Sequence, residues 1–485
     1  MELKLGITFD DVLLVPQYST VTSRQNVNLS TKISKNISLN IPIVSSNMDT
    51  VTEDRMAIAM AREGGIGIIH RYCSVSDQVE MVKRVKRAES HIITDPYTVN
   101  IDDTVEEVRN KIKEYKVSTY LVADVEEMEC RDGSIIEMIW LKGIITRRDL
   151  KCRNDEEFVR DCMTKREDII SGNKDTTIEE AKKIMIDNKI QKLPILDGKL
   201  VKGLICLKDI ERVQENPLAN RDSEGRLRCG AAIGVKEDDI KRAKELIDAG
   251  VDVLVIDVAH GDSQLCVNTL LRCKEKFPST DIIAGNVATA DGAERLIRAG
   301  ADGIKVNIGA GSICTTRIVS GCGVPQFTAL MDVAPICRKY NVPLISDGGN
   351  RNSGNMCKAL AIGASCIMLG RMIAGTDESP GKVLVKDNKR VKMIRGMAGL
   401  MANISNSIRQ GIPEPNTLSF TPEGVEGYVP YTGPVRDTLL QICNGIKSGV
   451  SYCGAHNIID MQARAQFIRI TPSGITESHV HDILH

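Results

Sequence analysis

Eight short apolar segments, rich in β-branched residues, recur along the 485-residue chain and constrain its fold more than any other feature. Each is followed by a cluster of Gly, Asn, Asp or His and, in most cases, by a segment with helical periodicity. Continuous apolarity is typical of strands buried on both faces, and eight such strands alternating with helices favour a closed parallel barrel over an open sheet. We therefore predict an α/β fold built on a (β/α)8 TIM barrel, with strands at 41–47, 65–70, 229–235, 253–259, 282–287, 303–309, 343–349 and 365–370.

The segment between the second and third predicted strands differs in composition: it is richer in charged residues and contains an internal duplication. Residues 117–124 followed by 143–149 are echoed by residues 190–197 followed by 203–209. Each copy is expected to form a helix, two strands and then a helix that opens near an Asp. We predict a catalytic domain of residues 1–93 and 213–485, interrupted by a smaller domain at 94–212.

The overall composition limits which kinds of partner and which cellular compartment we expect. Sixty-three basic and sixty-four acidic residues nearly cancel, which argues against a broad surface for nucleic acid or an anionic membrane and favours small-molecule partners. Fifteen cysteines without paired metal-type spacing fit reduced thiols. The start of the chain lacks a signal-peptide core, and no run of 18 apolar residues occurs. We expect a cytoplasmic protein. Residues 482–485 match no address signal, so the sequence neither indicates nor excludes an organelle.

The segment that follows the sixth predicted strand, residues 306–317, carries the sharpest chemical signal. It leaves the strand through two glycines and presents Ser312, Cys314, Thr315 and Thr316. Glycines permit positive φ and close approach of a ligand, and a cysteine on such a loop is a candidate nucleophile. The alternative is a small buried hydrophobic residue, which is what most cysteines are.

The seventh and eighth predicted strands end in segments suited to a phosphate. Residues 346–349 read Ser-Asp-Gly-Gly and residues 369–371 read Leu-Gly-Arg. Barrels of this class commonly hold a phosphate there on backbone N–H groups, to which Arg371 would add a charge-assisted contact. Asp347 is placed to accept hydrogen bonds from a ribose diol. The alternative for residues 346–349 is a tight turn with an Asp cap.

Several motifs in register resemble the IMP dehydrogenase and GMP reductase family and span nearly the whole chain. They comprise Thr8–Pro16, Asn47–Val51, Gly64–Gly67, Ala284–Val287, Gly311–Thr316, Ser346–Gly349, Arg395–Met397 and Glu477–His479. The resemblance implies a nicotinamide-dependent oxidoreductase of purine metabolism, acting on GMP or IMP with NADPH or NAD. It also implies a homo-tetramer, possibly an octamer.

The same resemblance assigns roles by position. Cys314 would form a covalent bond to C2 of the purine, with Thr316 and Glu423 as proton donors. Backbone carbonyls of Gly309, Gly311 and Cys314 would hold a monovalent cation such as K⁺. The expected substrate contacts are Ser312, Asp347, Gly348, Gly349, Gly370, Arg371 and Met397, and the expected cofactor contacts are Asp257, Ala284, Gly285 and Asn286.

The duplicated insert resembles a tandem cystathionine-β-synthase (CBS, or Bateman) domain, whose Thr and Asp bind the ribose of adenine or guanine nucleotides. The first copy keeps both residues as Thr146 and Asp149, whereas the second has Cys206 in place of Thr and keeps Asp209. We therefore expect regulatory nucleotides here, although the second cleft keeps only one residue of the ribose-binding pair. The alternative is a pair of repeats that dock on each other and bind nothing.

The two branches of the family differ around the covalent step. Dehydrogenases that this chain resembles carry an Arg-Tyr pair on a flap, to activate water; here Arg409 is followed by Gln410. Other departures in the phosphate and flap loops also favour a reductase, at residues 47, 370–372, 394 and 398–399. The inserted domain and the motifs at both ends of the chain favour a dehydrogenase. We predict a GMP reductase, with IMP dehydrogenase as the alternative and an inactive nucleotide-sensing assembly protein as the lesser one.

Overall fold

A computed structural model describes residues 3–88, 93, 96–115, 117–129, 135–208, 210, 216–409 and 421–480. The chain divides into two compact units, Met1–Ala88 with Leu218–His485, and Glu89–Pro217. The second unit thus begins at residue 89, where the sequence predicts 94, and ends at 217, where it predicts 212.

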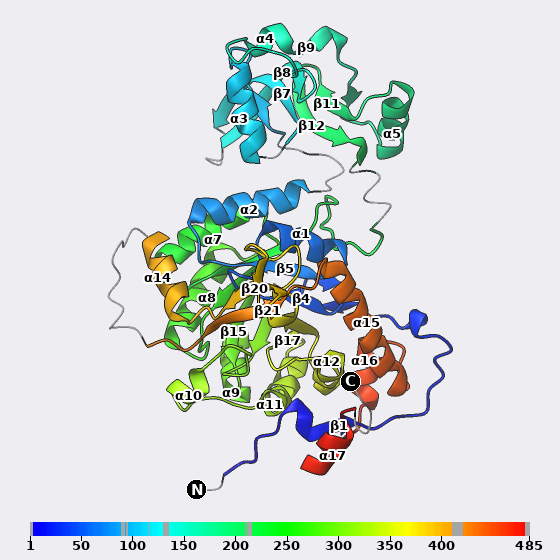
Figure 1. Ribbon diagram of the computed structural model, residues 1–485, viewed down its shortest axis with the longest axis vertical. Coiled ribbons are helices and arrows are strands. Elements are labelled where there is room, and N and C mark those ends of the chain that lie inside the picture. Colours follow the sequence, from blue (N-terminus) through cyan, green and yellow to red (C-terminus); the bar gives the residue numbers. More distant parts are fainter. Residues whose placement is uncertain are drawn as a thin grey trace. The chain divides into compact units, whose positions relative to one another are not determined.

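Eight parallel strands of the first unit close into a barrel in the order β13-β14-β15-β16-β17-β18-β4-β5 (Figure 1). The eight predicted strands are confirmed, and the fold is a TIM barrel. The closing contacts pair Val44 with Ile66 and Ala231 with Ile69. The strands are β4 (Ile43–Ser45), β5 (Ile66–Ile69), β13 (Cys229–Ile233), β14 (Val253–Asp257), β15 (Asp281–Val287), β16 (Gly303–Val306), β17 (Leu344–Asp347) and β18 (Cys366–Leu369).

The strands are largely apolar because both of their faces are buried. Alternate residues such as Val44, Ile68 and Ile283 fill the barrel interior, while their neighbours pack outward against the helices. The surrounding helices show the matching periodicity: α9 buries Ala293 and Leu296, and Thr289 caps its first turn. These helices are α1 (Asp54–Arg62), α2 (Val75–Arg87), α7 (Asp238–Asp248), α8 (Gln264–Lys276), α9 (Ala290–Arg298), α11 (Gln326–Lys339), α12 (Ser353–Ile362), α15 (Val435–Tyr452) and α16 (Ile458–Arg464).

Short elements decorate the barrel unit. A three-stranded sheet of β19 (Leu384–Lys386), β20 (Lys389–Arg395) and β21 (Glu426–Pro430) leads into α14 (Leu400–Arg409) and returns from it. Two-stranded pairs form between β1 (Val12–Leu14) and β22 (Phe467–Arg469) and between β2 (Thr31–Lys32) and β3 (Ser38–Leu39). The remaining helices are η1 (Phe9–Asp11), η2 (Arg24–Asn26), α10 (Thr316–Val319), α13 (Arg371–Ala374) and α17 (Pro472–Glu477).

The second unit contains one sheet in the order β10-β11-β12-β8-β7-β6, with β9 paired to β8. The two predicted repeats are present as antiparallel pairs, β7 with β8 and β11 with β12. The elements are β6 (Thr98–Val99), α3 (Val105–Tyr115), β7 (Thr119–Glu129), β8 (Ile135–Thr146), α4 (Val159–Cys162), β9 (Thr164–Lys165), η3 (Arg166–Asp168), β10 (Gly172–Asn173), α5 (Ile178–Asp187), β11 (Lys192–Asp197) and β12 (Leu200–Cys206).

One detail of the first repeat is predicted wrongly. No helix opens at Asp149, because residues 147–152 form turns and the next helix is the four-residue α4. The Asp149 carboxylate accepts hydrogen bonds from the Thr146 backbone N–H at 2.8 Å and from its hydroxyl at 2.7 Å, which closes a turn directly on the end of β8.

No helix among the described residues is long and apolar enough to cross a membrane.

Candidate active site

Cys314 lies on the loop that leaves β16, at the end of the barrel where the strands terminate. The loop turns at Gly309, whose φ is +77° and where an added Cβ would lie 2.6 Å from the Arg317 side chain. The Cys314 side chain is half-buried and lines a cavity of about 410 Å³. The sulfur is therefore accessible at the face where this fold carries its chemistry.

A hydrogen-bonded chain connects the cysteine to a carboxylate. The Cys314 thiol donates to the Thr316 hydroxyl at 3.1 Å, and that hydroxyl donates to Glu423 Oε2 at 2.7 Å. The backbone fixes this arrangement, since the Thr315 N–H donates to the Glu423 carbonyl at 2.9 Å and the Val425 N–H donates to the Ile313 carbonyl at 3.0 Å. The three predicted catalytic residues thus come together, although 107 residues separate Thr316 from Glu423.

A buried lysine connects two of the predicted ligand-binding carboxylates. Lys305 Nζ lies 3.2 Å from Asp257 and 3.1 Å from Asp347, and the Asn286 amide donates to Asp347 at 3.0 Å. Burial alone would lower the pKa of Lys305, but Asp347 and Asp257 outweigh it and raise that pKa above its ordinary value. The cation therefore holds Asp257 and Asp347 in place while both line the Cys314 cavity.

The pKa of Asp257 responds to the same neighbours. Burial alone would raise it, but Lys305, Arg71 and a hydrogen bond from Asn47 lower it below its ordinary value. Asp257 is thus kept as a carboxylate, the form that accepts hydrogen bonds from hydroxyl groups.

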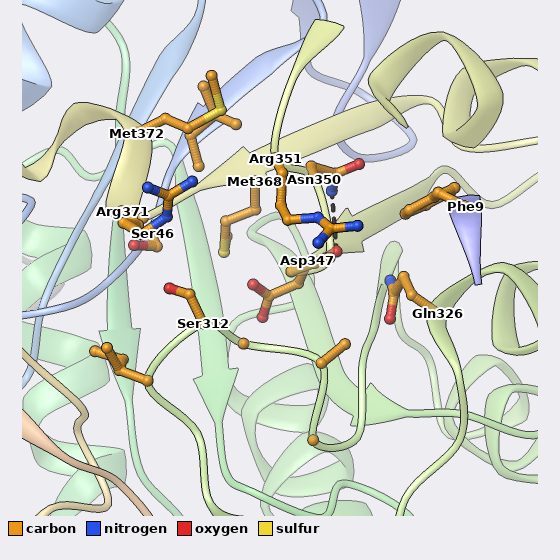
Figure 2. Close-up of a pocket in the computed structure, with 18 of the residues that line it drawn as sticks. Phe9, Ser46, Ser312, Gln326, Asp347, Asn350, Arg351, Met368, Arg371 and Met372 are labelled. Carbon is orange, nitrogen blue, oxygen red and sulfur yellow. Dashed lines mark hydrogen bonds between the residues drawn. The ribbon is translucent and has the colours of Figure 1, made fainter. Parts of the chain in front are cut away.

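A second cavity of about 430 Å³ adjoins the first, and both are lined by Gly309, Gly311 and Asp347. Figure 2 shows that Ser312, Asp347 and the guanidinium groups of Arg351 and Arg371 surround this second cavity. The predicted residues Gly348, Gly349 and Gly370 also line this cavity. Positive φ values at Gly348 (+93°) and Gly349 (+76°) turn the backbone here. Arg351 is ion-paired with Asp10, which also lines the cavity, so the backbone N–H groups beside Arg371 are the groups best suited to a phosphate.

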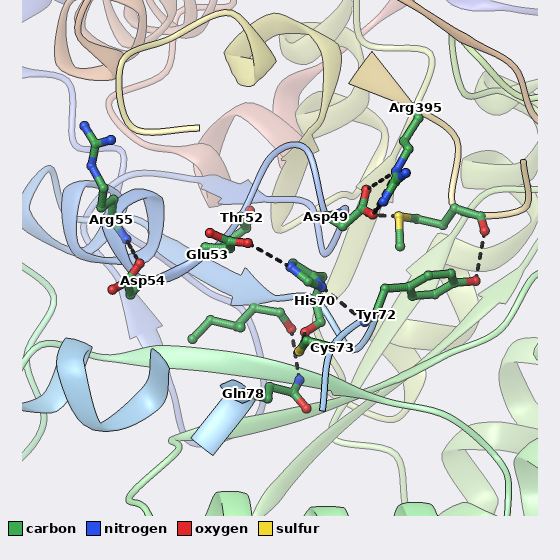
Figure 3. Close-up of polar contacts among 12 residues, drawn as sticks. Asp49, Thr52, Glu53, Asp54, Arg55, His70, Tyr72, Cys73, Gln78 and Arg395 are labelled. Carbon is green, nitrogen blue, oxygen red and sulfur yellow. Dashed lines mark hydrogen bonds and ion pairs between the residues drawn. The ribbon is translucent and has the colours of Figure 1, made fainter. Parts of the chain in front are cut away.

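A buried ion pair supports the loop that carries Met397. Arg395 Nε donates to Asp49 Oδ1 at 3.1 Å and to Oδ2 at 2.9 Å (Figure 3). The Tyr72 hydroxyl donates to the Met397 carbonyl at 2.9 Å, and Met397 lines the Cys314 cavity. Two motifs far apart in the sequence, at 47–51 and 395–397, therefore form one wall of the site.

Unsatisfied polar atoms concentrate at the two cavities. Of six buried polar side-chain atoms without a hydrogen-bond partner in the described ranges, five belong to residues that line them. They are Ser46 Oγ, Arg71 Nε, Asn286 Oδ1, Gln326 Oε1 and Asn350 Oδ1. Buried polar groups are nearly always paired, so this concentration indicates a site built for polar ligands.

Comparison with known proteins decides the family. The model of the IMP dehydrogenase / GMP reductase domain matches residues 6–481. The chain belongs to this family.

Curated relatives of this IMP dehydrogenase / GMP reductase family member carry both names. The chain is 47% identical to inosine-5'-monophosphate dehydrogenase of Nitrosopumilus maritimus, over 100% of both proteins. It is 48% identical to GMP reductase of Leishmania donovani, over 99% of this chain and 97% of that one. A crystal structure of a cysteine-to-alanine variant of Trypanosoma brucei GMP reductase with guanosine 5'-monophosphate matches with a TM-score of 0.89 and 45% identity, covering 99% of each chain. The family uses NAD(P), and its full-length match includes an inserted CBS domain.

Part of the predicted cofactor segment of this family member is not at the site. Ala284 is fully buried in the barrel wall, and Gly285 packs against the Lys305 backbone, because both lie within β15. Asn286 does line the Cys314 cavity, together with Asp257. The unpartnered Asn286 Oδ1 and Arg71 Nε and the Asp257 carboxylate fit the amide and hydroxyl groups of a nicotinamide nucleotide.

The predicted cation would depend on the backbone. No group of three His, Cys, Asp or Glu side chains suited to a metal occurs in the described part of the chain. Gly309, Gly311 and Cys314 do lie on one loop, where the Gly311 carbonyl accepts from the Cys314 N–H at 3.1 Å. Carbonyl oxygens of this kind suit a hard cation, so K⁺ here stays a prediction.

Sequence reasoning missed several residues of the site. Lys305 carried a readable signal, because a charged residue inside an otherwise apolar strand is rare unless it is paired. Arg71, Arg351 and Asn350 stand in loops without such a signal. The flap position Gln410 lies outside the described residues, as does Asp209.

Proposed function

We propose that this chain is a GMP reductase, which converts GMP and NADPH to IMP, ammonia and NADP. The observation that carries the proposal is the chain of hydrogen bonds from Cys314 through Thr316 to Glu423, at 3.1 and 2.7 Å. Loss of an amine requires a proton at the departing nitrogen. These hydrogen-bonded residues can take the proton of the Cys314 thiol and return it to that nitrogen.

The proposed reaction begins and ends at Cys314. The Cys314 sulfur bonds to C2 of GMP while its proton passes through Thr316 to Glu423. The same relay then protonates the 2-amino group, the C2–N bond breaks and ammonia leaves, so that the purine is held by the C2–S bond. The nicotinamide cofactor, when bound, supplies the hydride that C2 requires. Rupture of the C2–S bond releases IMP and a Cys314 thiolate, which recovers a proton from solvent.

The remaining residues receive binding roles under this proposal. Ser312, Arg371 and the glycines of the second cavity hold the nucleotide phosphate, and Asp347 holds the ribose. Asp257 and Asn286 hold the nicotinamide riboside, and Lys305 holds the two carboxylates in place. Met397, on the loop after β20, contacts the purine.

IMP dehydrogenase remains the second candidate because the dehydrogenase of N. maritimus is 47% identical over its whole length. That reaction uses the same covalent bond but then requires an activated water. Gln410 follows Arg409 where the dehydrogenases that this chain resembles have Tyr, and this substitution favours the reductase.

Parallel assays of one purified sample test the choice. With GMP and NADPH, we expect the absorbance of NADPH to fall while ammonia and IMP accumulate in equal amounts. With IMP, NAD and K⁺, we expect no NADH above the rate of a Cys314→Ala control. Steady NADH and XMP formation without turnover of GMP would overturn the proposal in favour of the dehydrogenase.

We further propose that the second unit binds adenine or guanine nucleotides and that the protein assembles as a tetramer or octamer. Thr146 and Asp149 line a cavity of about 550 Å³ together with Arg147, Arg148 and Lys192. Hydroxyl, carboxylate and cationic groups in one cavity suit the ribose and phosphates of a nucleotide. Light scattering and activity that both stay unchanged with millimolar ATP and GTP would count against this role.

A further inference from the structure

Lys192 and Cys206 face each other across the two strands of the second repeat. They are directly opposite in the antiparallel register of β11 and β12, and Lys192 Nζ lies 2.6 Å from Cys206 Sγ. This separation is shorter than the ~2.7–3.2 Å of an ordinary N–H···O hydrogen bond, although sulfur is larger than oxygen. The two atoms are therefore closer than a simple hydrogen bond to sulfur requires.

The first repeat provides an internal comparison at the same rung. There the paired residues are Thr119 and Thr146, at the same register position of β7 and β8. The backbone is equivalent in both repeats: the Arg147 N–H donates to the Ser118 carbonyl at 2.8 Å, as the Leu207 N–H does to the Gln191 carbonyl at 3.1 Å. Both members of the pair differ between the repeats: the lysine and the cysteine of the second repeat stand where the first has two threonines.

The surroundings allow the pair to react selectively. Cys206 is only 2% exposed, which shields its sulfur from large thiols, while Lys192 lines the cavity of about 550 Å³ and opens a path for a small oxidant. An adjacent ammonium group stabilises a thiolate, which is the form that oxidants attack.

We propose that Lys192 and Cys206 form an oxidation-dependent covalent bridge through a single oxygen atom, Nζ–O–Sγ. One oxygen bonded to both atoms spans a gap of this size without movement of either strand. With dioxygen as oxidant, the ammonium group and the thiolate react together: two N–H bonds break, S–O and N–O bonds form, and the second oxygen atom leaves as water with the two hydrogens. Sulfur and nitrogen each lose two electrons, which matches the four that dioxygen accepts. The bridge removes the positive charge of Lys192 from the cavity and joins β11 to β12.

Peptide mass spectrometry of the full-length protein tests this proposal. The reduced protein is exposed to air-saturated buffer or to dilute hydrogen peroxide, alkylated and digested with trypsin. Because trypsin cannot cleave after a bridged Lys192, we expect peptide 190–199 linked to peptide 203–208. The expected mass is the sum of the two peptides plus one oxygen atom and minus two hydrogen atoms, and dithiothreitol should abolish this species.

Matched variants separate the bridge from ordinary oxidation. Cys206→Ser and Lys192→Arg should each eliminate the linked species, the latter while keeping the positive charge. Cys152→Ser, which removes an exposed cysteine of the same unit, should leave it unchanged. Cleavage after Lys192 at the same yield before and after oxidation, with Cys206 found only as thiol, sulfinic or sulfonic acid, would overturn the proposal.

Discussion

Replacing Lys305 with methionine tests how strongly the paired carboxylates of the site depend on one buried cation. Methionine keeps most of the side-chain volume but leaves Asp257 and Asp347, now 3.2 and 3.1 Å from Lys305 Nζ, without their shared partner. Removal of one member of a buried ion pair typically costs about 3–5 kcal/mol. We expect the free energy of unfolding near pH 7 to fall by about that amount.

The loss of stability in the Lys305→Met variant should depend on pH in a definite direction. In the wild type the lowered pKa of Asp257 means that its carboxylate stabilises the fold above its ordinary pKa, and this contribution is lost as the pH falls. In the variant, burial acts on Asp257 without Lys305, so protonation relieves the unpaired charge. The difference between wild type and variant should therefore shrink as the pH falls toward about 4.

Urea unfolding followed by far-ultraviolet circular dichroism at both pH values provides the measurement. Lys244→Met is the matched control, because Lys244 pairs with Asp248 on an exposed helix face, where the two side chains are 70% and 61% exposed. That change should cost less than about 0.5 kcal/mol. An equal loss for Lys305→Met at both pH values would refute the reasoning, since it would show that lost packing and not unpaired charge sets the cost.

Three further predictions concern the site directly. Cys314→Ala should abolish turnover of GMP while leaving the circular dichroism spectrum unchanged, and residual turnover above the uncatalysed rate would exclude the covalent step. Thr316→Val and Glu423→Gln should each lower kcat for GMP by about 10²–10⁴-fold, the usual contribution of a positioned acid, with little change in KM; the double variant should be no worse than the poorer single one, because the residues act in one relay. Arg371→Met should raise KM for GMP by more than it changes kcat, whereas guanosine, which has no phosphate, should show no difference between the variant and the wild type.

The barrel was predictable from the sequence because its strands are buried on both faces. Continuous apolar runs such as residues 253–256 and Cys366–Leu369 distinguish them from half-exposed strands. The insert was predictable from its duplication, but the turn at Asp149 was not. A side-chain cap competes there with helix formation, and the same residues can begin either structure.

Only part of the candidate site could be predicted from the sequence. Cys314 and Thr316 lie two residues apart on one glycine loop, so the sequence alone puts them together. Glu423 came only from the family resemblance, and nothing local indicates that its loop pairs with the backbone of Ile313 and Thr315. Ala284 was misplaced because a motif fixes which residues are present but not which of them face the cavity.

The alternation of strands and helices, the inserted duplication and the loop that carries the thiol follow from local periodicity and backbone freedom, which can be seen in the sequence alone. The ion pairs of Lys305 with Asp257 and Asp347 and of Arg395 with Asp49, and the contact of Lys192 with Cys206, appear only once the chain is folded. Each of these contacts joins separate elements across a barrel or a sheet, and the register between such elements is set by how the whole core packs.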